Sequence, residues 1–222
     1  MCKCGLFAVE KQEMLNVANE LLFRVAFSAL WIVFFANVVR AGYLAKWSGG
    51  KAAHREAGHM RITALTFAFL YLAGAMLYTL LPDWIAFLAV ALPGWFRLSM
   101  VGVAALGLGF ISWALWCLGK NWAPSLSGVR KDAFLVSTGP YAIIRHPIYL
   151  GAFVFLAALS LVAANLLILL PAIALLALLY TQIGGEEATL IEKFGDEYRE
   201  YMKRTPRFIP TFRHEEIEKC PR

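Results

Sequence analysis

Three long stretches with almost no charged residues constrain the fold of this 222-residue chain more than any other feature. They run from Leu65 to Leu81, from Leu98 to Leu118 and from Ile148 to Ile183. A helix needs about 20 apolar residues to cross the hydrocarbon core of a bilayer. The chain is also only 16% charged, whereas soluble domains carry about 25% charged residues. The sequence therefore predicts an all-α polytopic membrane protein, with residues 1–222 forming a single integral membrane domain.

The first half of the chain is expected to supply three spanning helices, over residues 21–39, 62–81 and 98–118. Pro82 ends the second, because proline cannot continue a helix. The apolar segment 84–92 is too short to cross a bilayer and is placed at the interface. Ala105 and Gly109 are small, so we expect them to allow close helix contact in the third span.

The apolar run 148–183 is too long for one helix and predicts two more spans, five in total. Asn165 near its middle and Pro171 soon after indicate a tight helical hairpin of residues 148–163 and 166–183. Beyond the hairpin, four apolar or aromatic residues recur at helical spacing and predict one C-terminal amphipathic helix. They are Leu190, Phe194, Tyr198 and Tyr201.

Most of the 21 Lys and Arg residues fall after the first span, before the hairpin and after it. By the positive-inside rule, this distribution places the N-terminus outside and the C-terminal tail in the cytoplasm. The polar segments 120–147 and 184–213 then share one membrane face. The net charge of +6 is explained in the same way, so we expect membrane lipids and no nucleic acid as partners.

Residues 138–149 form the densest group of unusual residues. The Gly139-Pro140 pair forces a turn, and Pro147 suits the first position of the next helix. Arg145 and His146 are thus predicted at a helix entrance, where free N–H groups favour anions. From this segment alone, anchoring of a helix end at the lipid headgroups explains these two residues equally well.

A second group follows the last span. Gln182 and Glu186 are four residues apart on one helical face, so both can point at one cavity. Glu186 lies close to the apolar run, where an ionisable group tends to face a cavity. Glu187 is better explained by a solvated first turn of the next helix. No metal site is expected, since the cysteines lack zinc spacing and His54 and His59 fit a solvated loop.

The order of these motifs resembles the isoprenylcysteine carboxyl methyltransferase family and its bacterial and phospholipid-methylating relatives. The resemblance covers about residues 130–210. It is carried by Leu135-Val136, Gly139-Pro140-Tyr141, Arg145-His146-Pro147-Ile148-Tyr149, Glu186-Glu187, Phe194-Gly195 and Thr205-Pro206-Arg207-Phe208-Ile209-Pro210.

The resemblance implies a methyltransferase that uses S-adenosylmethionine, enclosed between the segment before the hairpin and the C-terminal tail, and a lipophilic methyl acceptor of the isoprenylcysteine carboxylate type or a related small molecule or lipid. It also assigns residues. The implied catalytic residues are Gln182, Glu186 and Arg207. The implied cofactor contacts are Phe134, Leu135, Val136, Tyr141, His146, Pro147, Tyr149 and Glu186.

One position departs from the family. Gln182 stands where the prenylcysteine enzymes have an arginine that is associated with the substrate carboxylate. A neutral amide can form hydrogen bonds with an acceptor but cannot balance a buried carboxylate. Arg204 and Arg207 are the remaining candidates for that cation.

Two other functions are compatible with the pattern. A membrane sterol or lipid reductase with NADPH as cofactor has a similar C-terminal half, although Glu186 and Glu187 suit the extra ribose phosphate poorly. A non-catalytic family member is favoured only by Gln182.

Overall fold

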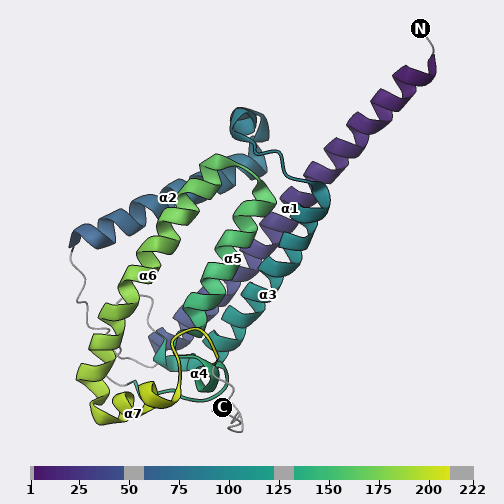
Figure 1. Ribbon diagram of the computed structural model, residues 1–222. Helices are drawn as coiled ribbons and strands as arrows, with labels where there is room; N and C mark the ends of the chain where they lie inside the picture. The colour runs from purple at the N-terminus through teal and green to yellow at the C-terminus, as the bar shows by residue number, and fades with distance from the viewer. Residues whose placement is uncertain (1–2, 48–57, 123–132, 211–222) are drawn as a thin grey trace.

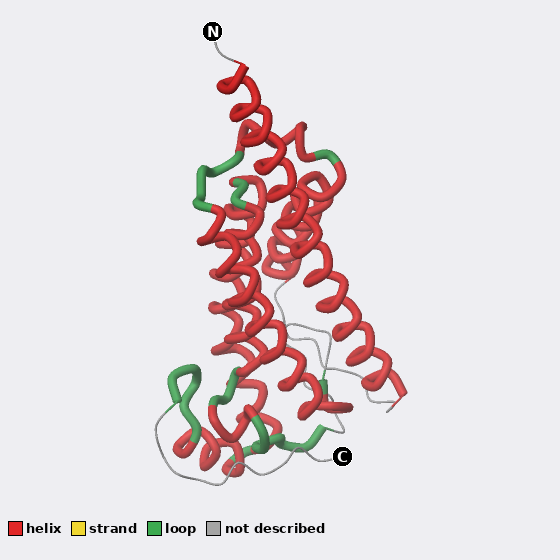
Figure 2. Tube along the Cα trace, turned by 90° about the vertical axis from the view of Figure 1, so that its right-hand side faces the viewer, coloured by secondary structure: helices red, strands yellow, loops and turns green. Residues whose placement is uncertain are grey.

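The computed structural model describes residues 3–47, 58–122 and 133–210, and within these ranges it contains helices and no β-strands (Figures 1 and 2). The long helices share one bundle, and the short elements lie at its two ends. The elements are α1 (Lys3–Trp47), α2 (Gly58–Leu80), η1 (Pro82–Leu88), α3 (Gly94–Leu118), η2 (Gly119–Asn121), α4 (Pro140–Ile143), α5 (Pro147–Ala163), α6 (Leu166–Phe194) and α7 (Asp196–Arg204).

Four of the described helices are long and apolar enough to cross a membrane. Their apolar windows are Val17–Leu44, Ile62–Leu80, Gly94–Asn121 and Leu166–Phe194. α5 is apolar as well but has only 17 residues. α1 begins well before the expected residue 21 and α6 continues past residue 183, because helix geometry extends into the polar flanks of each apolar run. The chain is therefore a helical, multi-pass membrane protein.

α3 and α5 make the tightest contact of the bundle. A Cβ atom on Gly107 would lie 2.9 Å from the Phe155 nitrogen, and one on Gly151 would lie 2.6 Å from Ile111 Cγ1. The expectation that Ala105 and Gly109 make the close contact is wrong: Ala105 is exposed and a Cβ atom on Gly109 meets nothing within 4 Å. α5 packs against the other face of α3, which carries the small, buried residues Ala104 and Gly107.

A buried arginine joins four helices at one end of the bundle. Arg97 donates to the Val162 carbonyl oxygen over 2.9 Å and to the Tyr78 hydroxyl over 3.2 Å, and it forms an ion pair with Glu20. It is 7% exposed and its guanidinium lies over the Phe23 ring. These contacts tie α1, α2, α3 and α5 together at that end.

The chain reverses direction between α5 and α6, which lie side by side in Figure 1. Ala164 adopts a left-handed conformation with φ of 49°, and Asn165 caps α6. The Asn165 side chain accepts from the Leu167 nitrogen over 3.0 Å and donates to the Ile85 carbonyl oxygen over 2.8 Å. Asn165 thus fixes both the start of α6 and the position of η1.

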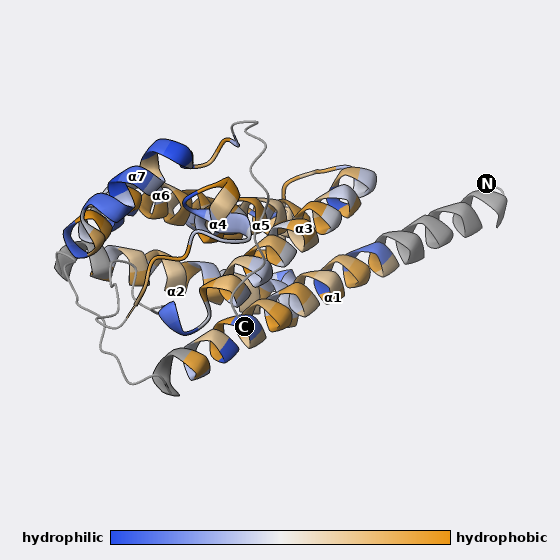
Figure 3. Ribbon diagram, turned by 90° about the horizontal axis from the view of Figure 1, so that it is seen from below, coloured by the Kyte–Doolittle hydropathy of each residue, from blue (hydrophilic) through white to orange (hydrophobic). Residues whose placement is uncertain are grey.

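The C-terminal part forms two helical segments and not the single amphipathic helix that the spacing predicts. α6 ends at Phe194, Gly195 has φ of 58°, and α7 begins at Asp196. This left-handed conformation is costly for residues other than glycine, so Gly195 sets the break. In Figure 3 most of the α7 ribbon has hydrophilic colours, whereas most of the bundle is coloured as hydrophobic.

Candidate functional site

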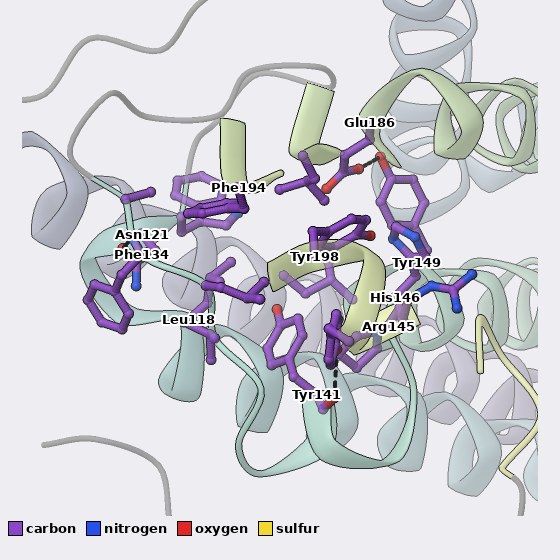
Figure 4. Close-up of a pocket in the computed structure, with 18 of the residues that line it drawn as sticks. Leu118, Asn121, Phe134, Tyr141, Arg145, His146, Tyr149, Glu186, Phe194 and Tyr198 are labelled. Carbon is purple, nitrogen blue, oxygen red and sulfur yellow. Dashed lines mark hydrogen bonds between the residues drawn. The ribbon is translucent and has the colours of Figure 1, made fainter. Parts of the chain in front are cut away.

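A cavity of about 270 Å³ (Figure 4) lies among α4, α7 and the last turns of α6. These elements lie at one end of the bundle (Figure 1). Three parts of the chain form its wall: the end of α3 with η2, the segment from residue 133 to the first turns of α5, and α6 with α7. Ala152 and Leu179 also line it, from within α5 and the spanning part of α6. The cavity therefore reaches from the polar end of the bundle toward its apolar interior.

All eight residues that the family resemblance implies as cofactor contacts line this one cavity. They are Phe134, Leu135, Val136, Tyr141, His146, Pro147, Tyr149 and Glu186. The other two assigned residues, Gln182 and Arg207, do not line it.

Glycine and proline residues shape the entrance to α5. Gly139 has φ of 59° and lets Pro140 start the short helix α4. Ile144 returns to an extended conformation, and Pro147 starts α5. Arg145 and His146 therefore occupy a short non-helical segment at the entrance to α5, between two helices.

Three basic side chains of the site contact the Glu187 carboxylate. Its Oε1 accepts from Arg145 Nε over 3.1 Å and Nη2 over 3.0 Å, and it lies 3.1 Å from His146 Nε2. Arg207 donates to both carboxylate oxygens of Glu187. The expectation of a solvated Glu187 is wrong: it is 4% exposed, because α6 continues through this position and turns it toward the α5 entrance.

The same contacts fasten the C-terminal segment over the site. Arg145 Nη1 donates to the carbonyl oxygens of Met202 over 3.1 Å and Thr205 over 2.7 Å. The Arg145 backbone nitrogen donates to the Pro206 carbonyl oxygen over 2.9 Å. The Tyr201 hydroxyl donates to the Tyr141 carbonyl oxygen over 2.6 Å. α7 and the residues after it are thus held against α4 and the start of α5.

Glu186 faces the cavity and accepts from the Tyr149 hydroxyl over 2.6 Å (Figure 4). Burial raises the pKa of the Tyr141 and Tyr198 phenols above the ordinary value, so both stay neutral at physiological pH. The Tyr198 hydroxyl is buried and has no hydrogen-bond partner among the described residues. The wall therefore combines aromatic faces, neutral hydroxyls and one carboxylate.

Gln182 lies one helical turn before Glu186 but outside the cavity wall. It is 5% exposed, and neither of its amide atoms has a hydrogen-bond partner in the described part of the chain. An unpaired buried polar group costs free energy of folding. The Gln182 amide therefore has a donor and an acceptor that the described residues leave without a partner.

Sequence reasoning missed several wall residues. Leu190, Phe194, Tyr198 and Tyr201 all line the cavity, and their helical spacing was the available signal, although it predicted only an amphipathic face. Leu118, Asn121 and Trp122 line it as well. Their sequence carries no pattern that separates them from any other end of a spanning helix.

Residues 100–192 match the model of the isoprenylcysteine carboxyl methyltransferase family. The chain is thus similar to that family over 93 of its 222 residues. Its curated relatives include a protein-S-isoprenylcysteine O-methyltransferase of Schizosaccharomyces pombe, 33% identical over 52% of this chain and 50% of that protein. A nickel-cobalt-cadmium resistance protein of Alcaligenes xylosoxydans xylosoxydans is 29% identical over 50% of this chain and 53% of that protein.

A methanethiol S-methyltransferase of Bradyrhizobium diazoefficiens is 44% identical over 32% of this chain and 24% of that protein. This chain thus spans about half the length of the Alcaligenes and Schizosaccharomyces relatives that it matches. A solved structure of the eukaryotic intramembrane Ras methyltransferase ICMT superposes with a TM-score of 0.47 at 22% identity, over 71% of this chain and 54% of that chain.

Proposed function

We propose that this protein is an integral membrane methyltransferase that uses S-adenosylmethionine and methylates a lipophilic acceptor. One observation carries the proposal: the eight residues that the family resemblance implies as cofactor contacts, separated by up to 52 positions in the chain, line a single cavity. The match of residues 100–192 to the isoprenylcysteine carboxyl methyltransferase family model supports the same reaction class.

The cavity residues fit this cofactor chemically. The adenine ring favours apolar and aromatic walls, which Phe134, Tyr141 and Phe194 provide. Aromatic faces and a carboxylate stabilise a sulfonium and an ammonium group, and Tyr149 and Glu186 supply both. The unpartnered Tyr198 hydroxyl offers a further hydrogen bond to a bound ligand. The volume of about 270 Å³ is near the lower end of ligand pockets, ~300–1,000 Å³.

Bound S-adenosylmethionine would supply an activated methyl group for in-line displacement. The protein then has to align the acceptor with that methyl group and keep water away. The Glu187 cluster serves this purpose, since it fixes Arg145 and His146 and holds α7 over the cavity. Arg207 contacts Glu187 and does not line the cavity, so we assign it a positioning role in place of a catalytic one.

The position of the cavity supports a lipophilic acceptor. Its wall continues along Ala152 and Leu179 into the apolar part of the bundle. We propose five spans, with α5 as the fourth, the N-terminus outside and the cavity on the cytoplasmic face. The acceptor would then enter from the bilayer and the cofactor from the aqueous side. We propose that Gln182 contacts the acceptor, because its buried amide has no hydrogen-bond partner among the described residues.

Binding of S-adenosylmethionine to the purified full chain, measured by titration calorimetry, tests the proposal. A hydrogen bond to a charged group contributes ~1.5–3 kcal/mol, so Glu186→Gln should weaken binding about 10- to 150-fold. Glu197→Gln, an exposed site on α7, is the matched control and should bind like the wild type. The proposal fails if the wild type binds neither S-adenosylmethionine nor its demethylated product but binds reduced nicotinamide cofactor.

A further inference from the structure

A groove separate from the cavity lies where α1 and α3 pack together, and we call it the α1–α3 groove. Its walls are Asn37 and Arg40 from α1 and Ser112, Trp113 and Trp116 from α3. Residues three or four positions apart share one face of a helix, so each helix contributes one continuous wall. None of these five residues lines the cavity, so a ligand of this groove would not occupy the candidate functional site.

The α1–α3 groove lies near the boundary of the spanning segments. Arg40 and Trp116 are both close to the end of the apolar window of their helix. The two windows end on the same side of the bundle, because a Cβ atom on Gly42 would lie 3.6 Å from the Trp122 ring. Tryptophan is enriched where hydrocarbon meets lipid headgroups, and a long arginine side chain reaches the headgroups from this depth. The groove therefore faces the part of a lipid that joins its phosphate to its acyl chains.

Arg40 gives this groove a positive charge that no described carboxylate balances. Its side chain is exposed, and the guanidinium carbon lies 5.7 Å from the centre of the Trp116 ring. The groove wall contains no acidic residue, and the ion pairs among the described residues do not include Arg40. The guanidinium fork binds phosphate through two parallel hydrogen bonds. The charge of the groove is therefore complementary to an anionic phosphate group.

The other wall residues suit the rest of a lipid. Asn37 Nδ2 donates to the Val33 carbonyl oxygen over 2.9 Å, which uses one of its two N–H groups and leaves the second for a ligand. This amide is three residues from Arg40, on the same helical face. Trp113 and Trp116 are 40% and 67% exposed, so their rings offer apolar surface to an acyl chain.

We propose that the α1–α3 groove binds one anionic phospholipid. The lipid phosphate pairs with Arg40 and accepts from Asn37, and an acyl chain lies against Trp113 and Trp116. A zwitterionic lipid also carries a quaternary or primary ammonium group, for which the groove wall has no carboxylate. The groove therefore prefers phosphatidylglycerol to phosphatidylcholine.

Native mass spectrometry of the full chain in detergent measures this preference, with dioleoyl phosphatidylglycerol and dioleoyl phosphatidylcholine titrated separately. One basic residue near the membrane surface favours an anionic lipid about fivefold, so the first phosphatidylglycerol should bind about fivefold more tightly than the first phosphatidylcholine. Arg40→Gln should remove most of this difference. Arg24→Gln is the matched control, because it removes the same charge from α1 outside the groove, and it should keep the difference. Equal affinity of the wild type for both lipids, or equal loss in the two variants, overturns the proposal.

Lipids with brominated acyl chains test where the phospholipid binds, because bromine quenches tryptophan fluorescence on contact. Brominated phosphatidylglycerol should quench the wild type more strongly than brominated phosphatidylcholine at the same mole fraction. This excess should disappear when Trp113→Phe and Trp116→Phe are combined. It should remain in Trp84→Phe, which removes a tryptophan that is 71% exposed on η1 and outside the groove. An excess that persists in the double variant overturns the placement of the lipid in the α1–α3 groove.

Discussion

Glu187→Gln is the substitution that tests most directly how the site is held together. The change keeps the size of the side chain but removes the charge that Arg145 and Arg207 share. The Arg145 side chain is only 10% exposed, so water cannot replace the lost carboxylate. The amide nitrogen of glutamine would also point a donor at a guanidinium group that has only donors.

The size of the effect follows from these contacts. Removal of one partner from a buried ion pair costs ~3–5 kcal/mol. For a chain of about 150–250 residues, 1 kcal/mol lowers the midpoint of thermal unfolding by ~2–4 °C. The Glu187→Gln variant should therefore unfold about 6–20 °C below the wild type. The C-terminal segment should loosen first, because Arg145 also holds the Met202 and Thr205 carbonyl oxygens.

Thermal unfolding in detergent, followed by intrinsic fluorescence, measures the midpoint, and limited proteolysis measures release of residues after α7. Glu197→Gln is the control, since this exposed side chain should change stability by no more than ~0.5 kcal/mol. A Glu187→Gln variant that melts within about 2 °C of the wild type and shows unchanged proteolysis would refute the conclusion that this carboxylate organises the site.

Two further predictions concern the bundle. Gly107→Ala should destabilise the protein by ~1–3 kcal/mol, because the new Cβ atom would lie 2.9 Å from the Phe155 nitrogen. Gly109→Ala is the control and should be tolerated, because its Cβ atom would face open space. Equal thermal midpoints for the two variants would contradict the packing of α3 against α5. Asn165→Ala should cost ~2 kcal/mol, from loss of the α6 cap and of the bond to the Ile85 carbonyl oxygen. Asn165→Asp keeps the capping oxygen and should lose about half as much in the same unfolding assay, and a full loss with Asp would show that the cap contributes little.

The sequence predicted the residues that line the cavity better than it predicted how they are held. Gly139, Pro140 and Pro147 restrict the backbone locally, so the break between α4 and α5 at Arg145 and His146 follows from residue type alone. The role of Glu187 did not follow in this way. Its three partners come from α5's entrance and from the segment after α7, and no local pattern tells which acidic residue will meet them.

The sequence likewise predicted that α3 is a spanning helix but did not predict which of its faces packs against α5. The apolar run 98–118 was sufficient to predict a spanning helix, and the helix Gly94–Leu118 is present. The sequence wrongly predicted that α3 packs through Ala105 and Gly109. A helix that is apolar on all sides has little hydrophobic periodicity, so its sequence does not distinguish the face that contacts lipid from the face that contacts protein. The contact with Gly151 on α5 selects Gly107 instead.

By itself, the sequence determined that the chain is a helical membrane protein and that its polar residues gather near one end of the hairpin region, because solvation in a bilayer acts on each segment separately. Only the tertiary structure decided that Glu187 is buried, that Gln182 and Arg207 lie outside the cavity wall, and that Tyr198 enters it. Gly195 redirects the chain after α6, and the ion pairs across three segments form only once that turn brings them together. The charge that a bound acceptor meets is a property of this assembly, not of any one segment.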